Sequence, residues 1–94
     1  MKKRILIIED NPMVVKSLEF KLTKDGYDVV VAEDGRKALE ILKEDDAIEL
    51  VITDLMLPYI TGTELIEHIR NNTPTMPIIV LSTSNQEEII TDAF

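Results

Sequence analysis

At residues 50–58 the chain reads Leu-Val-Ile-Thr-Asp-Leu-Met-Leu-Pro, and this stretch decides the fold. An aliphatic and β-branched run that ends in one acid is typical of a buried strand. The strand delivers Asp54 to its carboxyl end, and Pro58, which lacks a backbone N–H, turns the chain away. The stretch therefore predicts a buried strand that presents a single carboxylate at its exit.

Three further aliphatic runs, Ile5–Ile8, Val29–Ala32 and Ile78–Leu81, have the same character. Strands that are apolar on both faces are typical of parallel sheets covered by helices on both sides. Asn11 before Pro12, and Asp34 further on, are helix N-cap signals. The alternation predicts a single α/β domain over residues 1–94, with right-handed crossovers.

A fourth helix is predicted near the end of the chain, where Ser84 and Glu87 have the spacing of a capping box. An apolar stripe follows and consists of Ile89, Ile90, Ala93 and Phe94. The sequence stops as this stripe forms, without a visible cap. We therefore expect a domain that is truncated at its C-terminal side.

The composition limits the function classes. The 94 residues contain no cysteine, which excludes a disulfide scaffold and thiolate metal sites. A net charge of −8 repels phosphate backbones, so we expect no direct contact with nucleic acid. The run Ile5–Ile8 is too short for a signal core or a membrane span. We expect a cytoplasmic protein.

Three acids follow strands: Glu9 and Asp10 after the first, and Asp54 after the third. In open parallel sheets, sites lie outside the carboxyl ends of the strands. Converging carboxylates raise one another's pKa unless a cation neutralises them, and oxygen ligands favour Mg²⁺ or Mn²⁺ over zinc. A metal beside a nucleophilic aspartate suits phosphoryl transfer. Any one of these acids alone favours a solvated loop start, and the functional interpretation rests on the combination of Glu9-Asp10 with a lone aspartate at another strand exit.

The chain resembles the receiver domain of two-component response regulators. The resemblance rests on Gly62 and four motifs: Ile-Leu-Ile-Ile-Glu-Asp-Asn at 5–11, Ala-Glu-Asp-Gly-Arg-Lys-Ala-Leu at 32–39, residues 50–58, and Pro-Ile-Ile-Val-Leu-Ser at 77–82. It implies a flavodoxin-like three-layer α/β/α fold with a parallel sheet of order 2-1-3-4. The fifth strand and the fifth helix of the family have no counterpart in these 94 residues.

The resemblance also implies residue roles. Asp54 accepts a phosphoryl group from a histidine kinase or phosphotransfer protein, in a phosphorelay that can involve an output domain. Asp10, Asp54 and the backbone carbonyl of Met56 ligate Mg²⁺ directly, and Glu9 acts through water. Ser82 stands at the hydroxyl switch position. Such a domain catalyses its own modification and is not a turnover enzyme.

The family's lysine after the fifth strand is also missing, which leaves a second reading open. The chain could be a phosphorylation-incompetent interaction or oligomerisation module. Without the fifth strand and helix, the fourth strand is expected to be an open edge and one face of the sheet to be exposed. Such edges pair with other chains, so we expect a homo-oligomer formed through the exposed edge or face. A metal-dependent phosphohydrolase is disfavoured, because Glu9-Asp10-Asn11 replaces the Asp-x-Asp that such enzymes carry after the first strand.

Overall fold

A parallel sheet forms the centre of the protein. The computed structural model describes residues 3–54, 62–81 and 89–92. Its parallel strands are β1 (Arg4–Ile8), β2 (Asp28–Ala32), β3 (Ile48–Asp54) and β4 (Ile78–Leu81). They are hydrogen-bonded in the order β2-β1-β3-β4. The predicted strand order is therefore confirmed.

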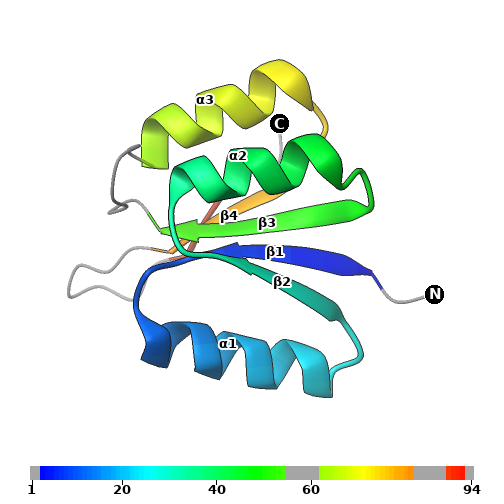
Figure 1. Ribbon diagram of the computed structural model, residues 1–94, viewed down its shortest axis with the longest axis vertical. Coiled ribbons are helices and arrows are strands. Elements are labelled where there is room, and N and C mark those ends of the chain that lie inside the picture. Colours follow the sequence, from blue (N-terminus) through cyan, green and yellow to red (C-terminus); the bar gives the residue numbers. More distant parts are fainter. Residues whose placement is uncertain (1–2, 55–61, 82–88, 93–94) are drawn as a thin grey trace.

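In the described part of the chain, three helices cover the two faces of this sheet. They are α1 (Pro12–Lys24), α2 (Gly35–Glu44) and α3 (Gly62–Asn72). Figure 1 shows α2 and α3 on one face and α1 on the other, which confirms the three-layer architecture. The two predicted caps are formed: Asn11 Oδ1 accepts from the Met13 N–H at 3.0 Å, and Asp34 Oδ1 from the Lys37 N–H at 2.9 Å. Within the described ranges, no helix has the length and apolar character that a bilayer crossing requires.

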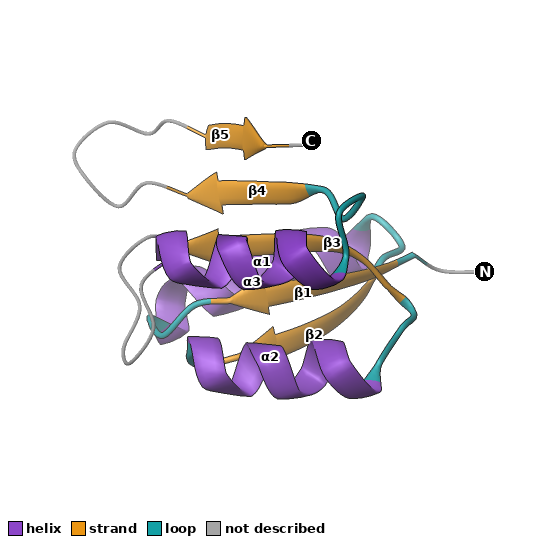
Figure 2. Ribbon diagram, turned by 90° about the horizontal axis from the view of Figure 1, so that it is seen from above, coloured by secondary structure: helices purple, strands orange, loops and turns teal. Residues whose placement is uncertain are grey.

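The predicted fourth helix is wrong at residues 89–92. These residues form β5 (Ile89–Asp92), which runs antiparallel to β4 at the edge of the sheet (Figure 2). The sequence Ile-Ile-Thr favours a strand because these residues are β-branched. Pairing also satisfies a row of β4 backbone groups that would otherwise be open, so the expectation of an open β4 edge is wrong as well. The other residues of that prediction lie outside the described ranges: Ser84, Glu87, Ala93 and Phe94.

The core is divided by the sheet into two apolar clusters. On the α2 and α3 face, Leu6, Ile8, Val51 and other buried side chains form the larger cluster. On the α1 face, the buried members are Ile5, Ile7 and Ile52. Alternate residues of each strand thus point to opposite faces, as the pleat requires. This alternation determines where the acids at the strand ends point.

Candidate functional site

Glu9 and Asp54 come together because they continue neighbouring rows of the sheet. Ile8 of β1 is in register with Thr53 of β3, so the next residue of each strand lies side by side. Glu9 follows Ile5 and Ile7 on the α1 face, and Asp54 follows Ile52 on the same face. Both acids are buried, with exposed fractions of 2% and 3%. Burial of two adjacent acids is unfavourable unless a proton or a cation compensates their charge.

The Glu9 carboxylate is held by the start of the loop that follows it. Its Oε1 accepts hydrogen bonds from the backbone N–H groups of Asp10 and Asn11, both at 3.1 Å. Its Oε2 is buried and has no hydrogen-bond partner among the described residues. One oxygen is thus fixed by the backbone, and the other is available to a ligand.

The electrostatics of the pair are dominated by Glu9. Burial, above all, raises the pKa of Glu9 to about 7, and the nearby carboxyls of Asp54 and Asp10 raise it further, while the Asn11 N–H opposes the shift. At neutral pH the Glu9 carboxyl is therefore close to half protonated. A proton on Glu9 removes one of the two negative charges of this buried pair.

The residues at this site fit a divalent cation. The donors are oxygens only, one of them a buried and unpartnered carboxylate oxygen, Glu9 Oε2. Among the described residues, no three carboxylate or imidazole side chains converge as a complete cage. Mg²⁺ does not need such a cage, because it commonly keeps several waters and takes one or two carboxylates. The third acid, Asp10, is exposed at the rim of the site.

Two of the residues that the resemblance implies cannot be placed. Met56, whose carbonyl is an expected metal ligand, and Ser82, the expected hydroxyl switch, lie outside the described residues. The structure adds one interaction that the sequence does not reveal. The Thr53 hydroxyl is buried and donates to the Asp54 carbonyl oxygen at 3.2 Å. A threonine directly before the acid was the only signal available for this contact.

Metal-free protein should lose stability as the pH rises through the titration of Glu9. Burial raises the pKa of Glu9 from 4.5 to about 7. The stabilising contribution of the protonated Glu9 carboxyl to the free energy of unfolding is therefore fully present below pH 4.5 and is lost as the pH rises to about 7. Mg²⁺ competes with this proton, so its stabilising effect should be larger at pH 8 than at pH 5.5. Thermal melts at both pH values, with Mg²⁺ or with EDTA, measure this.

Glu9→Gln provides the control for that experiment, since it removes the titrating group and keeps the shape. It should flatten the metal-free pH dependence between pH 5 and 7. An unchanged slope in the variant, or a melting temperature of the parent that rises over this window, would contradict the assignment.

Comparisons with known proteins place the chain in one family. The model of the response regulator receiver domain matches residues 5–94. The uncharacterised transcriptional regulatory protein YrkP of Bacillus subtilis is 42% identical over 82 residues, which cover 87% of this chain and 34% of that protein. The alkaline phosphatase synthesis transcriptional regulatory protein PhoP of the same species is 34% identical over 87 residues, which cover 93% of this chain and 36% of that protein. The chain spans about a third of the length of these relatives.

Solved structures of similar sequence have the same fold. The response regulator TrrA of Thermotoga maritima, solved in complex with Mg²⁺-BeF, has a TM-score of 0.83 and 34% identity, with 90% of this chain and 72% of that chain covered. The chemotaxis response regulator CheY4 of Vibrio cholerae has a TM-score of 0.84 and 26% identity, with 92% of this chain and 72% of that chain covered. One solved member of the family, TrrA, was thus observed with Mg²⁺ bound.

Proposed function

The chain belongs to the response regulator receiver domain family of two-component signalling, and from this premise we propose that Asp54 is its phosphoacceptor. One observation carries the proposal: Asp54 is buried beside Glu9 at the carboxyl end of the central strand β3. Asp54 ends a central strand and is held by the sheet, whereas Asp10 is exposed in the loop after β1. An acid fixed in this way is pre-positioned for attack.

The proposed step is a phosphoryl transfer. An oxygen of the Asp54 carboxylate attacks phosphorus and forms an acyl phosphate, and the bond from phosphorus to the donor histidine nitrogen breaks. The imidazole leaves with the electron pair of that bond. Thr53 holds the backbone carbonyl of Asp54 and thereby steadies the end of the strand during the transfer. The domain is modified in this reaction and is not a turnover enzyme.

Asp10, Asp54 and the backbone carbonyl of Met56 would ligate Mg²⁺ directly, and Glu9 would act through a water molecule. When bound, the ion neutralises the phosphoryl oxygens as they approach the acids. The unpartnered Glu9 Oε2 supports this arrangement, because it can accept a hydrogen bond from a metal-bound water. Ser82 is proposed to hydrogen-bond the phosphoryl group once it is on Asp54. Mn²⁺ has the same ligand preference and is expected to replace Mg²⁺.

The test uses a small phosphodonor, so that no kinase is needed. Acetyl phosphate or phosphoramidate is added with Mg²⁺, and the intact mass is recorded. One added phosphoryl group is expected, and Asp54→Asn and EDTA should each abolish it. Absence of an adduct in the folded parent would contradict the proposal and favour the phosphorylation-incompetent interaction module.

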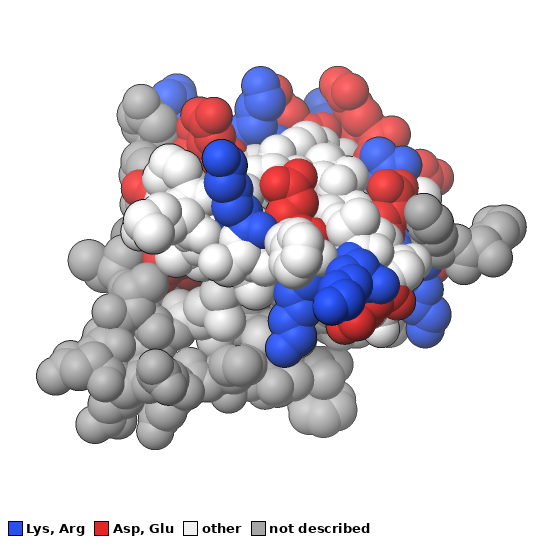
Figure 3. All heavy atoms as spheres, turned by 90° about the horizontal axis from the view of Figure 1, so that it is seen from below, with Lys and Arg blue, Asp and Glu red and all other residues white. Residues whose placement is uncertain are grey.

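The proposed kinase surface is the outer side of α1, which begins directly after the acids. Met13 and Phe20 are large apolar side chains with exposed fractions of 79% and 72%. Figure 3, which views the face that α1 covers, shows uncharged surface between lysine and acidic side chains. Exposed apolar side chains of this kind are typical of protein interfaces.

We place the chain in the cytoplasm, where histidine kinases present their phosphoryl groups.

Replacing Met13 and Phe20 by serine should therefore slow phosphotransfer from a kinase about tenfold or more. The measurement uses a panel of autophosphorylated histidine kinases and the fastest donor among them. Labelling by acetyl phosphate should stay unchanged, because the acids are not altered. Glu40→Gln, an exposed change on α2, is the control. Equal slowing with both donors would contradict a docking role.

Self-association is proposed through the sheet face beside α1 and not through the β4 edge. Helix α1 has no buried residue, and a cavity of about 360 Å³ next to it is lined by Tyr27, Leu50 and Ile79 among others. A second copy would cover this apolar surface. Sedimentation should show a fraction of dimer that increases with protein concentration, and Leu50→Lys should weaken this association. A folded monomer at high concentration would contradict this proposal.

A further inference from the structure

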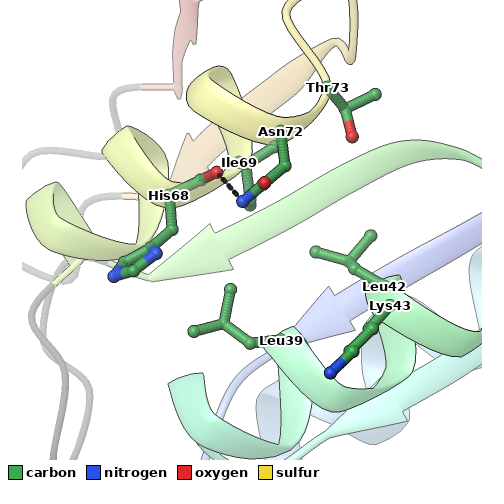
Figure 4. A pocket seen from close by; sticks show the side chains of 7 residues that line it. All are labelled: Leu39, Leu42, Lys43, His68, Ile69, Asn72 and Thr73. Atoms are coloured by element: carbon green, nitrogen blue, oxygen red, sulfur yellow. Dashed lines mark hydrogen bonds between the residues drawn. The ribbon is translucent and has the colours of Figure 1, made fainter.

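A second cavity lies between α2 and α3, on the face of the sheet opposite to α1. Its volume is about 420 Å³, within the range of small-molecule pockets. Figure 4 shows its lining residues, with Leu39 and Leu42 on α2 opposite the residues of α3. Its lining residues do not include Glu9 or Asp54, because these two acids lie on the face of the sheet that α1 covers. The cavity is therefore separate in space from Glu9 and Asp54.

The cavity has an apolar floor and a polar rim. Leu39, Leu42 and Ile69 provide the floor. Ile69 belongs to the larger core cluster, and the partly buried Leu39 and Leu42 pack against that cluster. The rim is formed by Lys43, His68, Asn72 and Thr73. The Asn72 side-chain N–H₂ donates to the His68 carbonyl oxygen at 2.9 Å, which fixes one wall in place. A pocket with this division binds molecules that are themselves apolar at one end and polar at the other.

The charge of the cavity rim indicates which polar group a bound molecule should carry. The chain has 18 acidic residues and a net charge of −8, yet none of the seven lining residues is acidic. The Lys43 ammonium and the His68 imidazole are exposed, and neither has an ion-pair partner within the described part of the chain. A carboxylate placed at this rim would meet one full cation and further donors, and no like charge from the lining.

We propose that the cavity between α2 and α3 binds a small organic anion with an apolar body and one carboxylate. The apolar body lies on Leu39, Leu42 and Ile69, and the carboxylate lies at Lys43 and His68. This proposal does not rest on phosphorylation of Asp54. A ligand here would contact the helices that flank the sheet, so it would stabilise the folded domain by mass action.

The test uses octanoate as the probe, with 1-octanol and octylamine as neutral and cationic analogues. Backbone amide shifts of the full chain are followed by NMR during titration. Saturable shifts are expected for octanoate at Leu39, Leu42, Ile69 and Asn72, with weaker binding of octanol and none of octylamine. Lys43→Gln should lower the affinity for octanoate about fivefold. Lys37→Gln changes the same helix outside the lining of the cavity and should leave this affinity unchanged.

Leu42→Ala adds a second, charge-independent arm and should weaken octanoate and octanol by similar factors. The proposal is overturned if octanoate causes no saturable shifts in the folded chain. It is also overturned if octanol binds as tightly as octanoate, or if the shifts centre on Met13 and Phe20 or on Leu50 and Ile79. The phosphorylation test with acetyl phosphate is unaffected by any of these outcomes.

Discussion

Asp54→Asn is expected to weaken Mg²⁺ binding strongly while making the metal-free protein more stable. Burial is the main cause of the raised pKa of Glu9, and the negative charge of its buried neighbour Asp54 raises that pKa further. Without that charge, folding the metal-free chain at pH 8 becomes more favourable by on the order of 1 kcal/mol or more. Because Asp54 is a proposed ligand of the ion, its replacement should weaken Mg²⁺ binding by more than tenfold. Opposite changes in the two quantities would identify the residue as functional and not structural.

Urea unfolding at pH 8 and calorimetric titration with Mg²⁺ measure the two effects. Asp46→Asn, which changes an exposed acid before the amino end of β3 and far from the carboxyl ends of the strands, is the matched control and should change neither quantity appreciably. A variant that is less stable than the parent without metal, yet binds Mg²⁺ equally well, would contradict the assignment of Asp54.

Leu6→Ala is expected to cause the largest loss of stability. Leu6 has no exposed surface, and it lies in β1 between β2 and β3, in the larger core cluster. Removal of a buried leucine side chain costs about 2–5 kcal/mol, in part because the cavity left behind does not collapse. The total free energy of unfolding of a domain is about 5–15 kcal/mol, so this substitution would remove much of the stability of this small chain.

Urea unfolding followed by circular dichroism measures this loss. Val29→Ala is the comparison, since Val29 is only partly buried and lies on the edge strand β2, and its cost should be clearly smaller. If Leu6→Ala costs less than Val29→Ala, the division of the core described above is wrong.

The sheet could be predicted because its strands are apolar on both sides and the acids stand at strand exits. The strand order came from the family resemblance, and the register β1–β3 then brings Glu9 and Asp54 together. The N-caps Asn11 and Asp34 were readable because the side chains that cap helices are few. The strands and the caps thus follow from local sequence, whereas the order of the strands needed the family resemblance.

The end of the chain could not be predicted from local signals. Residues 89–92 follow a capping-box pattern, but the free edge of β4 offers backbone hydrogen bonds that only the folded sheet provides. The unpartnered Glu9 Oε2 and the cavity at Leu42 and His68 were also invisible in the sequence, because both arise from how separate elements meet. Tertiary context, and not propensity, decides such features.

The most direct test of the central claim is to locate the phosphoryl group in the chain. After treatment with phosphoramidate and Mg²⁺, borohydride reduces an acyl phosphate on aspartate to homoserine, and peptide mass spectrometry identifies its position. We predict homoserine at position 54 and at no other acid, with none in the EDTA control. Homoserine at position 10, a phosphate ester on Ser82, or no modification of the folded chain would contradict the account.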